Sequence, residues 1–220
     1  QGSWLSIKTF GLAFLTTSIW EPNESREQYG ALAFMVGTLI SSALALLIAA
    51  PVGIGVATFI NEVLTARLRG IFRFCLEILA TIPSVVYGLW GIYVMAPWVK
   101  TLFMPAEGNA LRLIPFFGPP YSPKNMLCAA LMLAIMILPI IVSVSLDAIR
   151  MVPNSYREAA LGLGATRFEM ILLAVWPAAR SGMMGACILA LGRALGETMA
   201  VTMVIGNGRQ MSASLFAASD

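Results

Sequence analysis

Residues 181–208 read SGMMGACILALGRALGETMAVTMVIGNG and contain only two charged residues, Arg193 and Glu197. A lone arginine at the centre of a membrane span costs about 2.5–3.5 kcal/mol on insertion scales, so such residues usually belong to functional sites. The stretch therefore predicts a transmembrane helix in which Arg193 is a candidate site residue. Glu197 lies four positions later, on the same face of that predicted helix, and is its nearest possible partner.

Three further stretches of the chain carry no charge, and they cover residues 28–61, 78–99 and 125–146. A helix needs about 20 apolar residues to cross a bilayer, and an open sheet would leave unpaired backbone groups in lipid. Charged residues make up only 11% of the chain, whereas soluble domains contain about 25%. We therefore expect an all-α, polytopic membrane protein with four clear spans, at about 30–60, 78–99, 125–146 and 181–207.

The residue types present exclude several functions. The chain contains no histidine, and none of its three lysines follows a glycine. Catalysis by Ser-His or Cys-His pairs and metal sites with histidine ligands are therefore unavailable, and there is no P-loop to hold ATP. We expect no catalytic residues, no metal and no cofactor, so a partner must perform any ATP hydrolysis. The net charge of +3 gives no reason to expect nucleic-acid binding.

Alternation of the spans places loops 61–77 and 147–180 on one side of the membrane. These loops contain seven arginines, and the opposite side holds six basic residues: Arg67, Arg69, Arg73, Arg150, Arg157, Arg167 and Arg180 against Lys8, Arg26, Lys100, Arg112, Lys124 and Arg209. The positive-inside rule favours the first group as cytoplasmic. Residues 1–29 are then an extracytoplasmic or interfacial segment, followed by a transmembrane domain over 30–220.

Residues 158–177 read EAALGLGATRFEMILLAVWP. This segment resembles the EAA loop of ABC importer permeases at Glu158, Ala159, Ala160, Gly164 and Pro177, although its ending AVWP departs from the usual Ile-x-Leu-Pro. In that family the loop is a cytoplasmic coupling helix that fits a groove on the ATPase subunit. The resemblance therefore assigns these five residues to ATPase coupling, within a loop over 147–180.

Local sequence signals around this loop indicate two short helices. Ser155 is a candidate N-cap with Glu158 three residues later, which forms the pattern of a capping box. Gly164 is suited to end the first helix, and Thr166 with Glu169 can cap the second. An ordinary amphipathic surface helix is the alternative interpretation of this pattern.

Two other segments extend the resemblance: IPSVVYGLWG at 82–91 and GRALGETMAVT at 192–202. Both are similar to PstC-type permeases of phosphate-specific ABC importers, with the PstA-type sister subunit as the alternative. The resemblance implies the MetI-like fold of type I importers, with six spans, of which we expect the first and last to lie before Gln1 and after Asp220.

The resemblance also implies a place and a set of partners. The place is the bacterial plasma (inner) membrane, which the chain would cross several times among membrane lipid. The partners are a second permease (PstA-like), a cytoplasmic ATPase dimer (PstB-like) and an extracytoplasmic phosphate-binding protein (PstS-like).

The residue types around Arg193 suit an oxyanion. A guanidinium offers a planar fork of donors that matches phosphate oxygens. Glu197 can accept the proton that phosphate carries near neutral pH, and it repels sulfate, which has no proton to donate. Thr198 and Thr202 extend the polar stripe, so these four residues are the predicted substrate path.

Other interpretations remain open from the sequence. Arg193 and Glu197 could form a structural ion pair that locks this subunit to its sister. The transported ion could be sulfate or molybdate. An ion-coupled carrier or channel is a further alternative, which would need no EAA loop.

Overall fold

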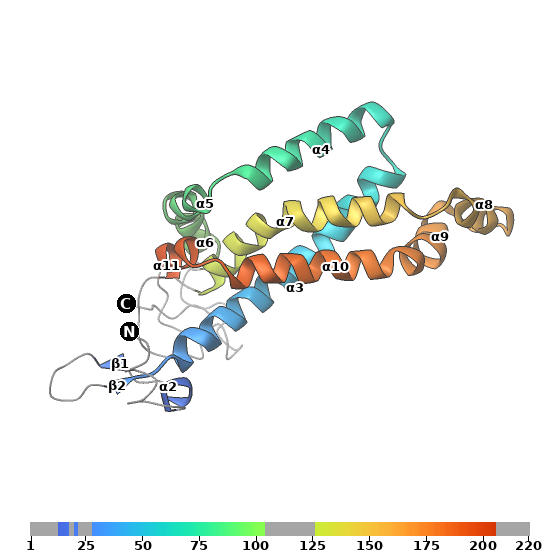
Figure 1. Cartoon of the computed structure of the whole chain (residues 1–220). Coiled ribbons are helices and arrows are strands. Elements are labelled where there is room, and N and C mark those ends of the chain that lie inside the picture. Colours follow the sequence, from blue (N-terminus) through green and yellow to red (C-terminus); the bar gives the residue numbers. More distant parts are fainter. Residues whose placement is uncertain (1–12, 18–19, 22–27, 104–125, 206–220) are drawn as a thin grey trace. The chain divides into compact units, whose positions relative to one another are not determined.

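The computed structural model describes residues 13–17, 20–21, 28–103 and 126–205 of the chain (Figure 1). At the start, helix α2 (Ala13–Thr16) precedes two short strands, β1 (Trp20–Glu21) and β2 (Gln28–Tyr29), which pair antiparallel. The predicted loop 100–124 is wrong at its start, because a helix over Ala96–Phe103 includes its first four residues. The rest of that loop, most of the predicted segment 1–29 and residues 206–220 lie outside the described residues.

The remaining described elements are all helical. In two places, three successive elements join without a break: α5, η1 and α6 in the first, and α9, η4 and α10 in the second. The elements η1 and η4 are π-helical turns within these longer helices. In chain order the elements are α3 (Leu32–Glu62), α4 (Ala66–Thr81), α5 (Ser84–Trp90), η1 (Gly91–Met95), α6 (Ala96–Phe103), α7 (Met126–Arg150), α8 (Asn154–Gly162), α9 (Arg167–Met170), η4 (Ile171–Val175), α10 (Trp176–Leu195) and α11 (Met199–Ile205).

Three of these helices are long and apolar enough to cross a membrane: Phe34–Glu62, Met126–Arg150 and Arg167–Leu195. A fourth span exists if α4 and Ser84–Val99 are the two parts of one broken span. The all-α membrane architecture predicted from the uncharged stretches is therefore confirmed. The first and third predicted spans coincide with α3 and α7, which continue through Pro51 and Pro139.

The predicted limits of the second span are wrong. Residues 61–77 were expected to form a polar loop before a helix over 78–99, but α4 begins at Ala66 and ends at Thr81. Ile82 has an extended backbone, with φ −63° and ψ 129°, because a residue before proline is disfavoured in the helical region. The break at Pro83 therefore divides what composition alone presents as one stretch.

The predicted limits of the fourth span are also wrong. The long apolar helix runs over Arg167–Leu195 rather than over 181–207. Apolar composition marks the part of a helix that suits lipid, whereas capping residues decide where the helix begins. The chain leaves the helix at Gly196 and forms the separate helix α11 from Met199.

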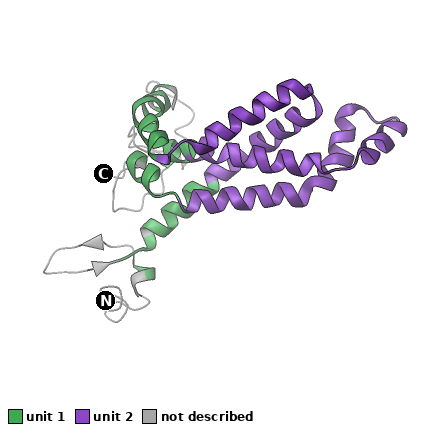
Figure 2. Cartoon of the chain, turned by 45° about the horizontal axis from the view of Figure 1, so that its top comes forward, with its two compact units in different colours: residues 1–43, 85–132, 197–220 green, residues 44–84, 133–196 purple. Residues whose placement is uncertain are grey.

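The chain folds into two compact units (Figure 2). Unit 2 comprises residues 44–84 and 133–196, and unit 1 comprises residues 1–43, 85–132 and 197–220. In unit 2 the buried core joins α3, α7 and α10 through residues such as Ile60, Leu146 and Ala179. In unit 1, Met132 of α7 and Val204 of α11 pack in one core with residues of η1 and α6.

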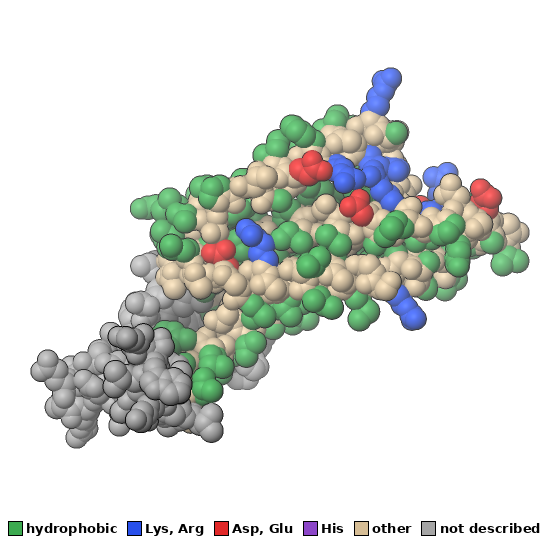
Figure 3. All heavy atoms as spheres, viewed as in Figure 1, with side chains coloured by type: hydrophobic (Ala, Val, Ile, Leu, Met, Phe, Trp, Pro, Cys, Tyr) green, Lys and Arg blue, Asp and Glu red, His purple; other side chains and the backbone are tan. Residues whose placement is uncertain are grey.

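Small residues let the helices of unit 2 approach closely. A Cβ atom added to Gly182 of α10 would collide with Ala148 of α7, and one added to Gly53 of α3 would lie 2.7 Å from Ile141 of α7. Close packing at small residues is a common way for helices to associate in lipid. On the face shown in Figure 3, hydrophobic side chains are distributed along the helices, and most charged side chains of unit 2 gather toward the end where α8 lies.

Candidate functional site

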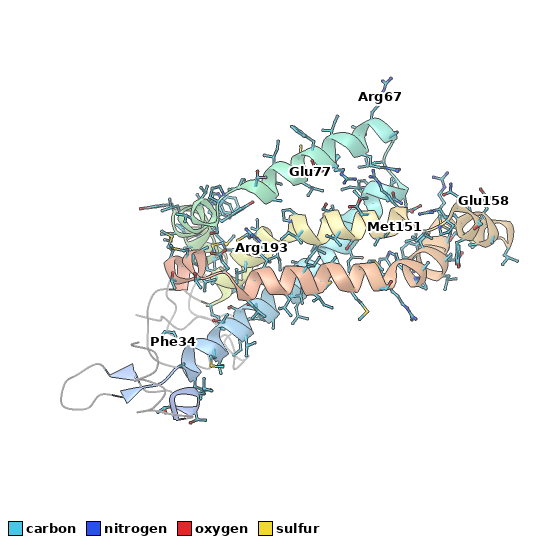
Figure 4. All side chains as sticks on the ribbon, in the orientation of Figure 1. Phe34, Arg67, Glu77, Met151, Glu158 and Arg193 are labelled. Carbon is cyan, nitrogen blue, oxygen red and sulfur yellow. The ribbon has the colours of Figure 1, made fainter. Side chains whose placement is uncertain are left out.

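Arg193 lies in the last turn of α10, and its residue is exposed. Figure 4 shows it at the end of the long helix that is remote from Glu158 and Met151. The preceding charged residue on this helix is Arg180, which lies about 20 Å from Arg193 along the helix axis at a rise of 1.5 Å per residue. If Arg180 marks the membrane boundary, Arg193 remains inside the hydrocarbon core of about 30 Å.

The surroundings of Arg193 within its own unit offer little compensation for its charge. Among the described residues of unit 2, no side-chain hydrogen bond or ion pair involves Arg193. Its position at the carboxyl end of α10 does help, because the helix dipole stabilises a cation there by about 0.3–1 kcal/mol, more where partly buried. Arg193 therefore keeps its guanidinium donors free within unit 2.

The prediction that Arg193 and Glu197 share one face of a continuous helix is wrong. The helix ends at Leu195, with Gly196 as its C-cap, so the two residues are not in successive turns of one helix. Instead, the Glu197 carboxylate accepts a hydrogen bond from the backbone N–H of Ala200, at 3.2 Å, at the start of α11. The predicted path residues thus belong to both units, with only Glu197, Thr198 and Thr202 in unit 1.

Thr198 and Thr202 are exposed; Thr198 directly precedes α11, and Thr202 lies in the middle of that helix. The Thr202 hydroxyl donates to the carbonyl oxygens of Thr198 at 2.9 Å and Met199 at 3.0 Å. Non-helical backbone inside a membrane is tolerated where protein buries it or where it lines a water-filled cavity. Broken helices of this kind also occur at the substrate sites of transporters. The non-helical residues Glu197 and Thr198 before α11 therefore suit contact with a polar ligand.

The second candidate region is the segment from α8 to α9, which contains four of the five EAA-like residues, whereas Pro177 lies farther on, in α10. The predicted capping box at Ser155 and Glu158 is wrong, because α8 starts after Pro153 and no side chain caps it. The predicted capping box at Thr166 and Glu169 is confirmed. There the Glu169 N–H donates to the Thr166 hydroxyl at 3.3 Å, and the Thr166 N–H donates to the Glu169 carboxylate at 2.8 Å.

Gly164 ends this first helix in the way the sequence predicted. Its φ of +89° lies in the left-handed region, which glycine enters at no steric cost. The N–H of Gly164 donates to the carbonyl of Leu161 at 3.0 Å, and that of Ala165 donates to the carbonyl of Ala160 at 3.1 Å. These two bonds form the Schellman motif, which satisfies carbonyls at the end of a helix.

The α8–α9 segment presents apolar side chains to solvent. Leu163 is 90% exposed, Phe168 69% and Tyr156 52%. Phe168 belongs to the long helix Arg167–Leu195, whereas Leu163 and Tyr156 lie outside the apolar spans. Exposed apolar side chains that form a patch are typical of protein–protein contact surfaces. A groove of about 920 Å³ lies beside α8, and Ala159, Ala160 and Pro177 are among its lining residues. The structure therefore brings three of the five EAA-like residues together, while Glu158 and Gly164 lie on the exposed side of the same segment.

Pro177 occupies an unexpected position, because the helix continues through it from Arg167 to Leu195. Proline has no N–H to donate, and its ring crowds the carbonyl four residues earlier. The π-helical turn η4 (Ile171–Val175) comes directly before it, and such a turn widens the helix locally. Trp176, the residue before Pro177, donates its indole N–H to the Thr58 hydroxyl of α3 at 3.1 Å.

Sequence reasoning did not identify one contact of this region. Arg157 of α8 forms an ion pair at 2.9 Å with Glu62, the last residue of α3. A signal was present, since Glu62 is the charge that ends the uncharged stretch 28–61, and Arg157 directly precedes the EAA-like residues. No spacing rule, however, links two residues 95 positions apart.

Comparisons with known proteins agree with these features. The family described as "Binding-protein-dependent transport system inner membrane component" matches residues 49–218. The phosphate transport system permease protein PstC of Mesorhizobium japonicum is 48% identical over 221 residues, covering 98% of this chain and 67% of that protein. PstC of Haemophilus influenzae is 43% identical over 223 residues, which cover 99% of this chain and 70% of that protein.

A more distant relative is the probable phosphate transport system permease protein PstC of Methanocaldococcus jannaschii. It is 35% identical over 218 residues, which cover 96% of this chain and 68% of that protein. Both the family match and these relatives extend over most of the helices described above. The chain therefore belongs to the family of inner-membrane components of binding-protein-dependent transport systems.

Proposed function

We propose that this chain is the PstC-type permease subunit of an ATP-driven phosphate importer. The observation that carries the proposal is Arg193, an exposed arginine within an apolar stretch, placed where a membrane helix breaks and without a partner in its own unit. A fixed cation there needs an anion, and the relatives that match most of the chain are named as phosphate transport permeases. Arg193, Glu197, Thr198 and Thr202 form the substrate path in this proposal.

The proposed chemistry at this path is binding and release, without covalent steps. The guanidinium of Arg193 donates two parallel hydrogen bonds to phosphate oxygens. The Glu197 carboxylate has only acceptor oxygens when ionised, so it can take a hydrogen bond from a protonated phosphate and repels a fully ionised sulfate. The permease of another oxyanion importer is the second candidate, because the guanidinium fork alone also fits sulfate or molybdate.

The remaining parts of the importer are partner subunits in this proposal. A second, PstA-like permease completes the path, and a PstS-like protein delivers phosphate from outside. A PstB-like ATPase dimer binds and hydrolyses ATP below the membrane. It docks on the α8–α9 segment, with Glu158, Ala159, Ala160, Gly164 and Pro177 as the coupling residues of the loop 147–180 within the domain 30–220.

The direct test of this function is uptake by the complete importer in proteoliposomes. We expect ATP-dependent uptake of radiolabelled phosphate that requires the binding protein and exceeds sulfate uptake. Glu197→Gln is expected to narrow that preference, because the amide removes the negative charge yet keeps an oxygen for the N–H of Ala200. Uptake that favours sulfate or molybdate, or that persists without the ATPase, would contradict the phosphate importer.

The orientation of the chain gives a separate prediction. Cysteines introduced by Arg67→Cys and Leu163→Cys should be protected from an impermeant thiol reagent in intact cells, because both positions are exposed on the proposed cytoplasmic side. Gly108→Cys, in the loop 100–124, should react. The measurement uses a background without the three native cysteines, and permeabilised cells provide the control for reactivity. Labelling of Leu163→Cys in intact cells would reverse the proposed orientation.

A further inference from the structure

A single side chain joins α8 to the ends of two membrane helices of unit 2. The Arg157 Nη2 donates to Glu62 Oε1 at 2.9 Å and to the carbonyl oxygen of Ile149 at 3.1 Å, and Nη1 donates to the carbonyl oxygen of Val152 at 2.7 Å. Glu62 is the last residue of α3, and Ile149 lies in the last turn of α7. Carbonyls at the end of a helix lack intrahelical partners, and the Ile149 carbonyl accepts both from this guanidinium and from the N–H of Val152 at 3.3 Å.

Burial separates this ion pair from the others in the unit. The side chains of Arg157 and Glu62 are only 15% and 9% exposed, whereas those of Arg73 and its partners Glu77 and Asp147 are 40–58% exposed. Exposed ion pairs contribute little, because water and salt screen them. Removing one partner of a buried pair is strongly destabilising, because the other charge is left uncompensated. The contact of Arg157 with Glu62 is therefore far less dispensable than those of Arg73.

The negative charge of Glu62 needs partners because of its position at the end of α3. A carboxylate at the carboxyl end of a helix is disfavoured by the helix dipole, and Glu62 occupies that position in α3. The side-chain amide of Asn61 also donates to Glu62 Oε1, at 2.8 Å, and Arg69 donates to the carbonyl of Asn61 at 2.6 Å. Apolar residues could join two helices here without desolvating charges. A buried ion pair also specifies which residues meet, so this pair can keep the ends of the two elements in register.

The two neighbours Arg157 and Glu158 point in different directions from α8, because successive helical residues are about 100° apart around the axis. Arg157 is partly buried and reaches α3 and α7, whereas Glu158 is exposed on the surface proposed to meet the ATPase. We propose that Arg157 is a positioning residue that makes the ends of α3 and α7 follow α8, so that movement of the ATPase reaches the membrane helices. This inference rests on the proposed function, in which α8 docks on the ATPase.

The first test compares transport with ATP hydrolysis in the complete reconstituted importer. Arg157→Gln keeps the exposed face of α8, so the ATPase should still co-purify, while phosphate imported per ATP hydrolysed should fall about tenfold, a usual size for coupling between two sites. Arg157→Lys should show a smaller fall, because it keeps the charge but loses the planar fork. Arg73→Gln is the matched control, since it removes an exposed ion pair to α7, and its ratio should not change. An unchanged ratio in Arg157→Gln, or a loss explained wholly by less assembled complex, overturns the inference.

The second test does not depend on the transported ion. Spin labels at Ser155 of α8 and at Val63, just after α3, both exposed, report whether the two elements move together. In the otherwise unchanged permease, the distance distribution should stay narrow both without nucleotide and with ATP trapped by vanadate. In Arg157→Gln it should broaden, and Arg157→Lys serves the same comparison if the glutamine variant does not assemble.

The outcomes separate this inference from the proposed function. If the labels behave as expected but the importer takes up no phosphate, the proposed substrate is wrong and the link through Arg157 stands. If phosphate uptake is normal and the distance distribution is the same with and without the guanidinium, Arg157 is an ordinary structural contact. In that case the double variant Glu62→Gln with Arg157→Gln should lose only stability, with an unchanged ratio of phosphate to ATP.

Discussion

Arg193→Ala is expected to abolish phosphate uptake by the assembled importer. A hydrogen bond to a charged group contributes about 1.5–3 kcal/mol, which corresponds to about 10- to 150-fold in rate or affinity for each bond lost. Removal of a bidentate guanidinium should therefore reduce uptake by at least about 100-fold. Arg193→Lys keeps the charge but not the fork, so it should retain measurable uptake at a strongly reduced level.

The measurement that decides the role of Arg193 is uptake per assembled complex. Arg180→Ala is a matched control, because Arg180 is also an exposed arginine of α10 but lies outside the apolar stretch 181–208. It should leave uptake nearly unchanged. If Arg193 instead locks this subunit to its sister, Arg193→Ala should lower the amount of complex, and each remaining complex should transport normally. Near-normal uptake per complex would remove Arg193 from the substrate path.

The sequence was sufficient for features that depend on composition and on local spacing. Long uncharged stretches predicted the helices around Pro51 and Pro139, because lipid tolerates little else. The capping pattern at Thr166 and Glu169 and the glycine at 164 were also predicted, since each depends on residues only a few positions apart. The structure confirms both, through the hydrogen bonds of the capping box and the positive φ of Gly164.

The sequence was insufficient where helix ends or distant contacts decide the outcome. The break at Gly196 was missed, because residues 181–208 contain only two charged residues and were taken from composition as one continuous span. That break removes the predicted helical register between Arg193 and Glu197. The contact of Arg157 with Glu62 depends on the tertiary arrangement of α3, α7 and α8, which no local pattern encodes. The substrate path and the coupling residues remain proposals that these variants test.

Gly164→Val is expected to uncouple the ATPase from the permease. Gly164 has a φ of +89°, and the space around it is open, since an added Cβ atom would have no neighbour within 4 Å. The cost of substitution is therefore conformational rather than steric contact with other residues. Left-handed backbone costs an L-residue about 1–2 kcal/mol, and β-branched residues are the least tolerant. Valine should therefore open the Schellman motif and change the path of the chain between α8 and α9.

The expected result is a fall in phosphate uptake of about 5- to 30-fold, the factor that corresponds to 1–2 kcal/mol, with the permease still inserted. Co-purification of the ATPase and the ratio of ATP hydrolysed to phosphate imported show whether docking or transmission is lost. Gly162→Val is the matched control, because Gly162 ends the same helix with open space around it but has no positive φ. Gly164→Asn should retain most of the activity, since asparagine tolerates the left-handed region. If Gly164→Val transports normally and binds the ATPase normally, the turn after α8 is not part of the coupling surface, and the assignment of the EAA-like residues to that surface fails with it.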